Sequence, residues 1–147
     1  MKCQYVVISE SFSLDVTSGR VSLFHLIDRI PVVSTPFVIP VLNFIALFEQ
    51  EDGDEDQVPF DLETSINGNV IAAFKQHVYF HDGQKLNRNL SQLQGAIIPE
   101  PGILSFRAVV GGEVLGYWNV IIEKSESDDQ ATSGIISKPK RRKKRKD

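Results

Sequence analysis

The chain has 147 residues, of which 41% are hydrophobic, 9% aromatic and 24% charged. This composition is typical of one soluble globular domain with a sizeable core, and the length is too short for two ordinary domains. A transmembrane helix is excluded because no apolar run approaches about 18 residues. The first residues also lack the long apolar region of a secretory signal.

The formal net charge of −3 is distributed very unevenly along the chain. Residues 1–137 carry 8 basic and 18 acidic side chains, a net charge of −10, whereas residues 138–147 carry 8 basic and one acidic side chain, a net charge of +7. An acidic body is therefore followed by a basic C-terminal segment, and this contrast is the strongest functional signal in the sequence.

Three segments in the first third of the chain have the composition of strands. Residues 4–9 are apolar and β-branched, and residues 41–48 are almost continuously apolar, as in a strand covered on both faces. Residues 20–30 follow a Thr-Ser-Gly turn, and alternation along this segment predicts one apolar face, formed by Val21, Leu23, His25 and Ile27.

Two hairpins are predicted from their turns. Asn67-Gly68 lies between strands expected at 60–66 and 69–74, and it supplies the positive φ angles of a type I′ turn. Gly111-Gly112 has the same position between 103–110 and 113–122. Trp118 and Tyr117 then lie on opposite faces of the last strand, so we expect one in the core and the other exposed as a candidate partner contact.

Residues 86–97 are open to two interpretations. The spacing of Leu86, Leu90, Leu93 and Ile97 suits a short helix, but the asparagines and Gly95 do not, and we favour an extended segment. The chain then contains seven or eight short strands with frequent turns, which predicts an all-β antiparallel sandwich.

The sandwich is expected to span residues 1–124. Residues 125–137 are polar and small apart from Ile135 and Ile136, which predicts a flexible linker. Residues 138–147 form the basic segment, and its consecutive like charges predict disorder in the absence of a partner.

Three stretches resemble a known family, namely QYVVI at 4–8, GRVSLFHLIDRI at 19–30 and PEPGILSFRAVVGG at 99–112. Together they are similar, over roughly residues 1–122, to a family of uncharacterised small bacterial proteins. The resemblance implies an immunoglobulin-like β-sandwich. It implies no activity, so no catalytic or binding residue is carried over, and it does not extend to the basic segment.

The basic segment is the predicted nucleic-acid-binding site, with the residues Lys138, Lys140, Arg141, Arg142, Lys143, Lys144, Arg145 and Lys146. Neutralising phosphates releases counterions and drives sequence-independent binding to RNA, DNA or a ribosome. It has no aromatic side chain for base stacking. An inert solubilising extension, a targeting address in a eukaryote and an anionic membrane surface remain alternatives.

Residues 49–56 form an acidic loop with six carboxylates, in which Asp52, Asp54 and Asp56 alternate. These three aspartates are a candidate set for a hard cation such as Ca²⁺. The loop fails the EF-hand pattern, which needs a glycine at the sixth position and a distal glutamate, and a solvated charged connection is the interpretation that the sequence favours. A further hypothesis is that this loop holds the basic segment when no polyanion is present.

Other candidate side chains point to no chemistry. His77 and His81 would lie about 13 Å apart on a strand, too far to share a metal, and His25 is expected in the core or at an interface. Cys3, the only cysteine, excludes an internal disulfide and suits a small buried filler. We therefore expect a reducing compartment, the cytoplasm in a bacterium or the nucleus in a eukaryote.

The sequence has no Gly-x-Ser-x-Gly elbow, glycine-rich phosphate loop or His-Glu-x-x-His helix, and we expect no cofactor. The function that we favour is a non-enzymatic binding or adaptor module, with a protein partner on the body and nucleic acid on the basic segment. A protein-only scaffold with an inert basic segment is the first alternative, and an enzyme of an unrecognised type is the second.

Overall fold

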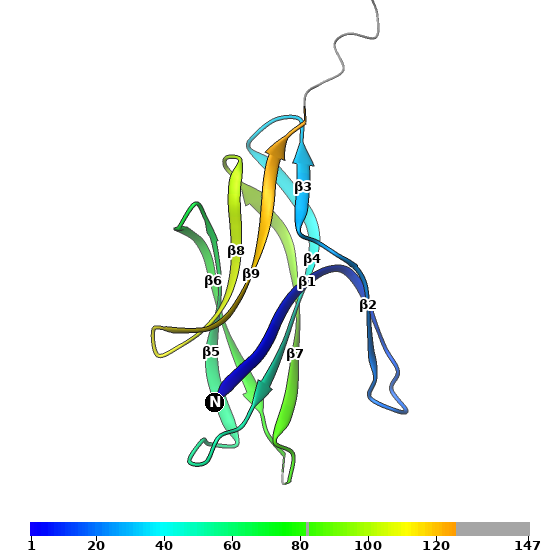
Figure 1. Ribbon diagram of the computed structural model, residues 1–147, viewed down its shortest axis with the longest axis vertical. Coiled ribbons are helices and arrows are strands. Elements are labelled where there is room, and N and C mark those ends of the chain that lie inside the picture. The colour runs from blue at the N-terminus through cyan, green and yellow to red at the C-terminus, as the bar shows by residue number, and fades with distance from the viewer. Residues whose placement is uncertain (82, 126–147) are drawn as a thin grey trace, which may run out of the picture.

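The computed structural model describes residues 1–81 and 83–125. All regular elements in this part of the chain are β-strands (Figure 1), and it contains no helix that is long and apolar enough to cross a membrane. The nine strands are β1 (Lys2–Leu14), β2 (Val21–Leu26), β3 (Arg29–Val32), β4 (Phe37–Glu49), β5 (Gln57–Ile66), β6 (Asn69–Tyr79), β7 (Leu86–Ile98), β8 (Gly102–Val110) and β9 (Glu113–Lys124).

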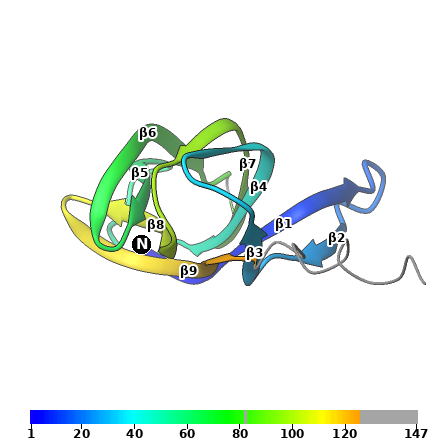
Figure 2. The ribbon, with the colours of Figure 1, turned by 90° about the horizontal axis from the view of Figure 1, so that it is seen from above.

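The strands form two sheets that pack face to face, as the view from above shows (Figure 2). The first sheet has the order β2-β1-β4-β7, and the second has the order β3-β9-β8-β5-β6. Every neighbouring pair is antiparallel except β3 and β9, which are parallel. The neighbours β4-β7 and β9-β8-β5-β6 correspond to strands B-E and G-F-C-C′ of immunoglobulin domains. The predicted immunoglobulin-like sandwich is thus confirmed.

The core lies between the sheets and centres on β4. Five consecutive residues of this strand, 42–46, are buried, which confirms the prediction of a strand covered on both faces. Phe44 is fully buried, and the rings of Phe48 and Phe60 lie 5.0 Å apart between the two sheets. Burial of these large apolar side chains is the main force that holds the sheets together.

Both predicted hairpin turns are present. Asn67 and Gly68 have φ angles of 49° and 84°, and Gly111 and Gly112 have φ angles of 58° and 87°. The Asn67 side chain also joins its turn to the start of β8, because its Oδ1 accepts a hydrogen bond from the Ile103 amide at 3.0 Å. Its Nδ2 donates to the carbonyl oxygen of Pro101 at 3.1 Å. The side chain of one turn therefore anchors the connection before β8.

Residues 86–98 form strand β7, which confirms the extended interpretation of this segment. The predicted strand at 20–30 instead divides into β2 and β3. The division occurs where the chain crosses between the sheets, since the amide of Ile27 donates to Ile8 in one sheet and the amide of Ile121 donates to Asp28 in the other. This crossing gives nine strands rather than the seven or eight predicted.

Strand β1 is longer than the predicted segment 4–9 and divides into two halves. Residues up to Ser9 pair with β4, whereas residues from Ser11 to Leu14 pair only with β2, and Ser9 pairs with both strands. This second half and β2 form a two-stranded hairpin, residues 10–26, which we call the arm. It projects from the side of the sandwich (Figures 1 and 2).

Candidate binding surfaces

The predicted nucleic-acid-binding residues lie outside the described residues, as does the linker from residue 126 onward. The described chain ends at Ser125, where its amide donates a hydrogen bond to the carbonyl oxygen of Val32 at 2.8 Å. The chain therefore leaves the sandwich at the ends of β9 and β3.

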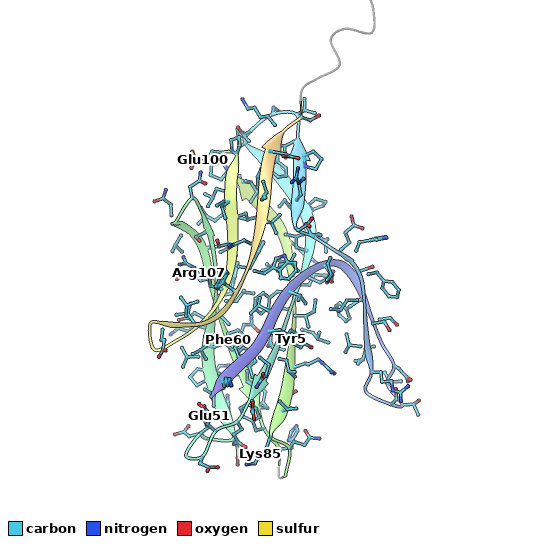
Figure 3. All side chains as sticks on the ribbon, viewed as in Figure 1. Tyr5, Glu51, Phe60, Lys85, Glu100 and Arg107 are labelled. Atoms are coloured by element: carbon cyan, nitrogen blue, oxygen red, sulfur yellow. The ribbon has the colours of Figure 1, made fainter. Side chains whose placement is uncertain are left out.

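The acidic loop lies at the opposite end of the sandwich. Strand β4 has 13 residues and leads from the β3–β4 connection to this loop, a path of about 40 Å at 3.3 Å per residue. Figure 3 shows Glu51 at this end and Glu100 at the other. Residues 126–147 lie outside the described residues, so the hypothesis that the loop holds the basic segment stays a prediction.

Within the acidic loop, the carboxylates make local contacts. The ammonium group of Met1 lies 2.9 Å from Oε2 of Glu51 and 2.6 Å from Oδ2 of Asp54. Burial by itself lowers the pKa of this amine, but hydrogen bonds to Asp54 and Glu51 outweigh it and leave the pKa raised. The same hydrogen bond from the amine lowers the pKa of Asp54.

The three candidate cation ligands do not converge. Asp54 is engaged with Met1, the Asp52 side chain is exposed with Lys85 Nζ at 4.0 Å, and the Asp56 carbonyl oxygen accepts from the amide of Phe80. Among residues 1–81 and 83–125, no group of three or more His, Cys, Asp or Glu side chains is arranged to hold a metal ion.

His25 was predicted to lie in the core or at an interface, and the first of these two alternatives is wrong. Its side chain is 80% exposed, and Nδ1 lies 2.9 Å from Oε2 of Glu10. The φ angle of His25 is 54°, which is a left-handed backbone conformation. The alternation that places Val21 and Leu23 on one face therefore stops at His25. His77 lies exposed on β6, and His81 follows the end of that strand.

Cys3 behaves as a filler, as expected from the sequence. Burial raises the pKa of its thiol to about 11, although the hydrogen bond to the Tyr5 carbonyl oxygen acts in the other direction. The thiol packs where β1 crosses β9, since a Cβ on Gly116 would lie 2.8 Å from Sγ of Cys3. Trp118 is half-buried and donates to the Ile27 carbonyl oxygen at 2.6 Å, whereas Tyr117 is exposed, in agreement with the prediction of opposite faces.

The arm is an exposed surface that the sequence patterns did not single out. Phe24 and Leu26 on β2 are 48% and 52% exposed, and Leu14 and Val16 near the tip are also exposed. A cleft of about 430 Å³ separates the arm from the outer face of the first sheet, and its apolar lining includes Leu47 and Leu90. The sequence feature that indicates this surface is the run VSLFHL at 21–26, which favours a strand and carries no formal charge.

A second groove lies on the open side of the sandwich, between β6 and β7. It has a volume of about 410 Å³, and its lining contains no charged side chain. Leu62 and Thr64 of β5 form part of the lining, and Phe74, Leu93 and Ile97 come from the two edge strands. This volume lies within the range of small-molecule sites, but no charged or catalytic group converges on it.

Comparison with known proteins does not assign a function to these surfaces. No protein-family model matches the chain, and no curated protein matches it significantly. The resemblance to a family of small bacterial proteins therefore stays a prediction.

Proposed function

We propose that the protein is a non-enzymatic binding module. In this proposal, its basic segment at 138–146 binds nucleic acid through electrostatic attraction, and its sandwich contacts a protein partner. Naked RNA, DNA and the RNA of a ribosome all present the phosphates that such a segment recognises. The same proposal places the protein in a reducing compartment.

The observation that carries the proposal is the separation of the two charges. The basic segment has a net charge of +7 within ten residues, and the chain leaves the sandwich about 40 Å from the acidic loop at 3.3 Å per residue of β4. Electrostatic interactions between exposed groups are largely screened beyond about 10 Å at 0.1 M salt. At the point where the chain leaves the sandwich, the acidic loop therefore contributes little repulsion to a bound polyanion.

The experiment is a fluorescence anisotropy titration of generic RNA and DNA oligomers at several salt concentrations. The full chain is compared with a chain truncated after Ser137 and with a full-length variant in which the eight Lys and Arg residues of 138–146 are replaced by Gln. We expect only the full chain to bind, with log K falling against log salt at a slope of roughly −4 if about five charges engage.

The glutamine variant is the matched control, because it keeps the length of the segment and removes its charge. Equal binding by the truncated chain would move the nucleic-acid site onto the sandwich. No binding by the full chain at low salt would contradict the nucleic-acid part of the proposal and favour a protein-only scaffold.

A further inference from the structure

The groove between β6 and β7 is bounded by the inner faces of the two sheets. On β6, Phe74 pairs with the fully buried Leu62, so both side chains lie on the inner face of the second sheet. On β7, Leu93 pairs in the same way with Leu42, which is also buried. Phe74 is nevertheless 48% exposed. The core is therefore uncovered along this side of the sandwich, where each sheet ends (Figure 2).

The lining of this groove defines the chemistry of an occupant. Ile71 and Ala72 extend the β6 wall, and Ala96 and Ile97 extend the β7 wall. Within the described residues, every polar side chain of the lining is uncharged. Burial of the apolar walls is favourable, whereas a charge placed between them would lose its hydration without a partner. An occupant should therefore present apolar side chains and carry no charge.

The sequence after β9 contains one segment with these properties. Residues 126–147 lie outside the described part of the chain, and their sequence has three blocks. Residues 126–129 include three acidic side chains, and the basic segment ends the chain. Between these blocks, residues 130–137 read QATSGIIS and carry no charge. Ile135 and Ile136 are the only large apolar side chains in the sequence after β9.

The length of the chain allows this pair to reach the groove. A row of paired residues crosses the second sheet from Ala72 on β6 to Trp118 on β9, and Ser125 follows Trp118 by seven residues. Three strand spacings across the sheet and seven residues along β9 place Ala72 about 27 Å from Ser125. Ten residues lead from Ser125 to Ile135, and an extended chain of this length spans about 33 Å.

We propose that Ile135 and Ile136 of this chain occupy the groove between β6 and β7. Consecutive residues of an extended chain point in opposite directions, so one isoleucine contacts the β6 wall at Phe74 and the other contacts the β7 wall at Leu93. The pair then covers the part of the core that the sheets leave open. The basic segment begins two residues later, so this docking determines where it emerges from the body. The inference does not depend on nucleic-acid binding.

The experiment attaches a nitroxide spin label close to the isoleucine pair in the full chain. The label is placed at Ser133→Cys in a Cys3→Ala background, and the amide signals of the sandwich are recorded by NMR with the label oxidised and reduced. We expect the oxidised label to abolish the signals of residues 71–74 and 93–97. The signals of β2 and of the acidic loop should remain, because both lie far from the groove. No loss at the groove would overturn the proposal.

Two matched variants test the role of the isoleucines themselves. Ile135→Ser with Ile136→Ser keeps the length and charge of the segment and removes its apolar side chains, so the groove signals should persist with the oxidised label. Ile135→Val with Ile136→Val keeps the apolar character, and the signals should again be lost. A loss that is as large in the serine variant as in the native segment would also overturn the proposal.

Salt separates this apolar contact from an electrostatic one. Raising the salt concentration from about 0.05 M to about 0.5 M screens exposed charges and should leave the loss at the groove unchanged. The glutamine variant of the basic segment should also keep it. A loss that disappears under either condition would contradict the proposal and assign the contact to the basic segment.

A mixing experiment identifies the chain that supplies the isoleucines. Isotope-labelled protein without a spin label is mixed with spin-labelled protein of natural isotopic composition. The groove signals of the first protein should persist, because each chain covers its own groove. Their loss would assign the occupant to a second copy and overturn the proposal. Each of these outcomes is unaffected by a failure of the nucleic-acid titration, so the two proposals can fail separately.

Discussion

The body of the sandwich and the arm are both antiparallel β-structure, yet they differ in what stabilises them. The contrast is clearest within β1. Val6 and Ile8 in its first half are buried in the core, whereas Ser11, Ser13 and Leu14 in its second half are exposed. The body is held by side chains that interlock between two sheets, and the arm is held mainly by its own ladder of hydrogen bonds.

This difference shows that strand formation and burial are separate properties of this chain. The arm continues the backbone ladder of the body without a second layer to cover it. A two-stranded hairpin is only marginally stable by itself, so we expect the arm to be the region that opens most readily. The following predictions compare matched changes in the two regions.

The largest difference in stability between the two regions is expected when a phenylalanine side chain is truncated. Phe44→Ala removes a fully buried ring from β4 and should lower the free energy of unfolding by about 3–5 kcal/mol. Phe24→Ala in the arm should cost less than about 1.5 kcal/mol, because half of that ring is already in water. Urea denaturation of dilute protein measures both, and equal losses would contradict the division between body and arm.

Glycine in the two regions should also respond differently. Gly102 begins β8 with φ 140°, and a Cβ there would lie 2.0 Å from Oδ1 of Asn67. Gly102→Ala should therefore displace the Asn67 side chain and cost about 2–4 kcal/mol. Gly19, at the turn of the arm, has φ 67° with nothing near the added Cβ, so Gly19→Ala should cost about 1 kcal/mol. Similar costs in thermal unfolding would contradict the anchoring role of Asn67.

The thiol of Cys3 reports on the packing between β1 and β9 without a substitution. Because burial raises its pKa to about 11 from an ordinary value of 9.0, the folded protein holds about 100-fold less thiolate at pH 8 than an unperturbed thiol would. Alkylation by iodoacetamide should be correspondingly slow and should accelerate on unfolding in urea. Rapid alkylation of the folded protein would show that β1 opens from β9.

The same pKa shift predicts the direction in which the free energy of unfolding changes with pH. A thiol whose pKa is raised by folding stabilises the fold at pH values below its unfolded pKa, and this stabilisation is lost as the pH rises from about 9 to about 11. The free energy of unfolding should therefore fall more steeply over this range for the native chain than for Cys3→Ala. Parallel curves for the two proteins would contradict the burial of the thiol.

The smallest effect is expected at the tip of the arm. Asp15 accepts hydrogen bonds from the Ser18 hydroxyl at 2.6 Å and from the Thr17 amide at 2.9 Å, and these contacts lower its pKa. They stabilise the turn above the unfolded pKa and are lost as the pH falls through the folded value. Asp15→Ala should loosen only the turn. Amide chemical shifts should therefore change at 15–20 and stay constant in β4, and changes in β4 would contradict this.

The sequence predicts the parts of this fold that depend on local chemistry. Asn67-Gly68 and Gly111-Gly112 identify two hairpins because their positive φ angles suit few other residues. The continuous apolar run at 41–48 identifies a strand covered on both faces. The sandwich follows from these elements and their spacing.

What the sequence could not predict depends on contacts between distant segments. The division of 20–30 into two strands arises because Asp28 pairs with Ile121, 93 residues further along the chain. The exposed position of His25 follows from a left-handed backbone conformation, which alternation does not reveal. The arm was missed because VSLFHL has the composition of a core strand, and only the sheet order places it at an edge.

The measurement that most directly tests the contrast between body and arm is hydrogen–deuterium exchange of the full chain. Amides of β4 should be strongly protected, whereas amides of β2 should be weakly protected. Protection of β2 that equals that of β4 would contradict the account, because it would show that the arm is stabilised as firmly as the body.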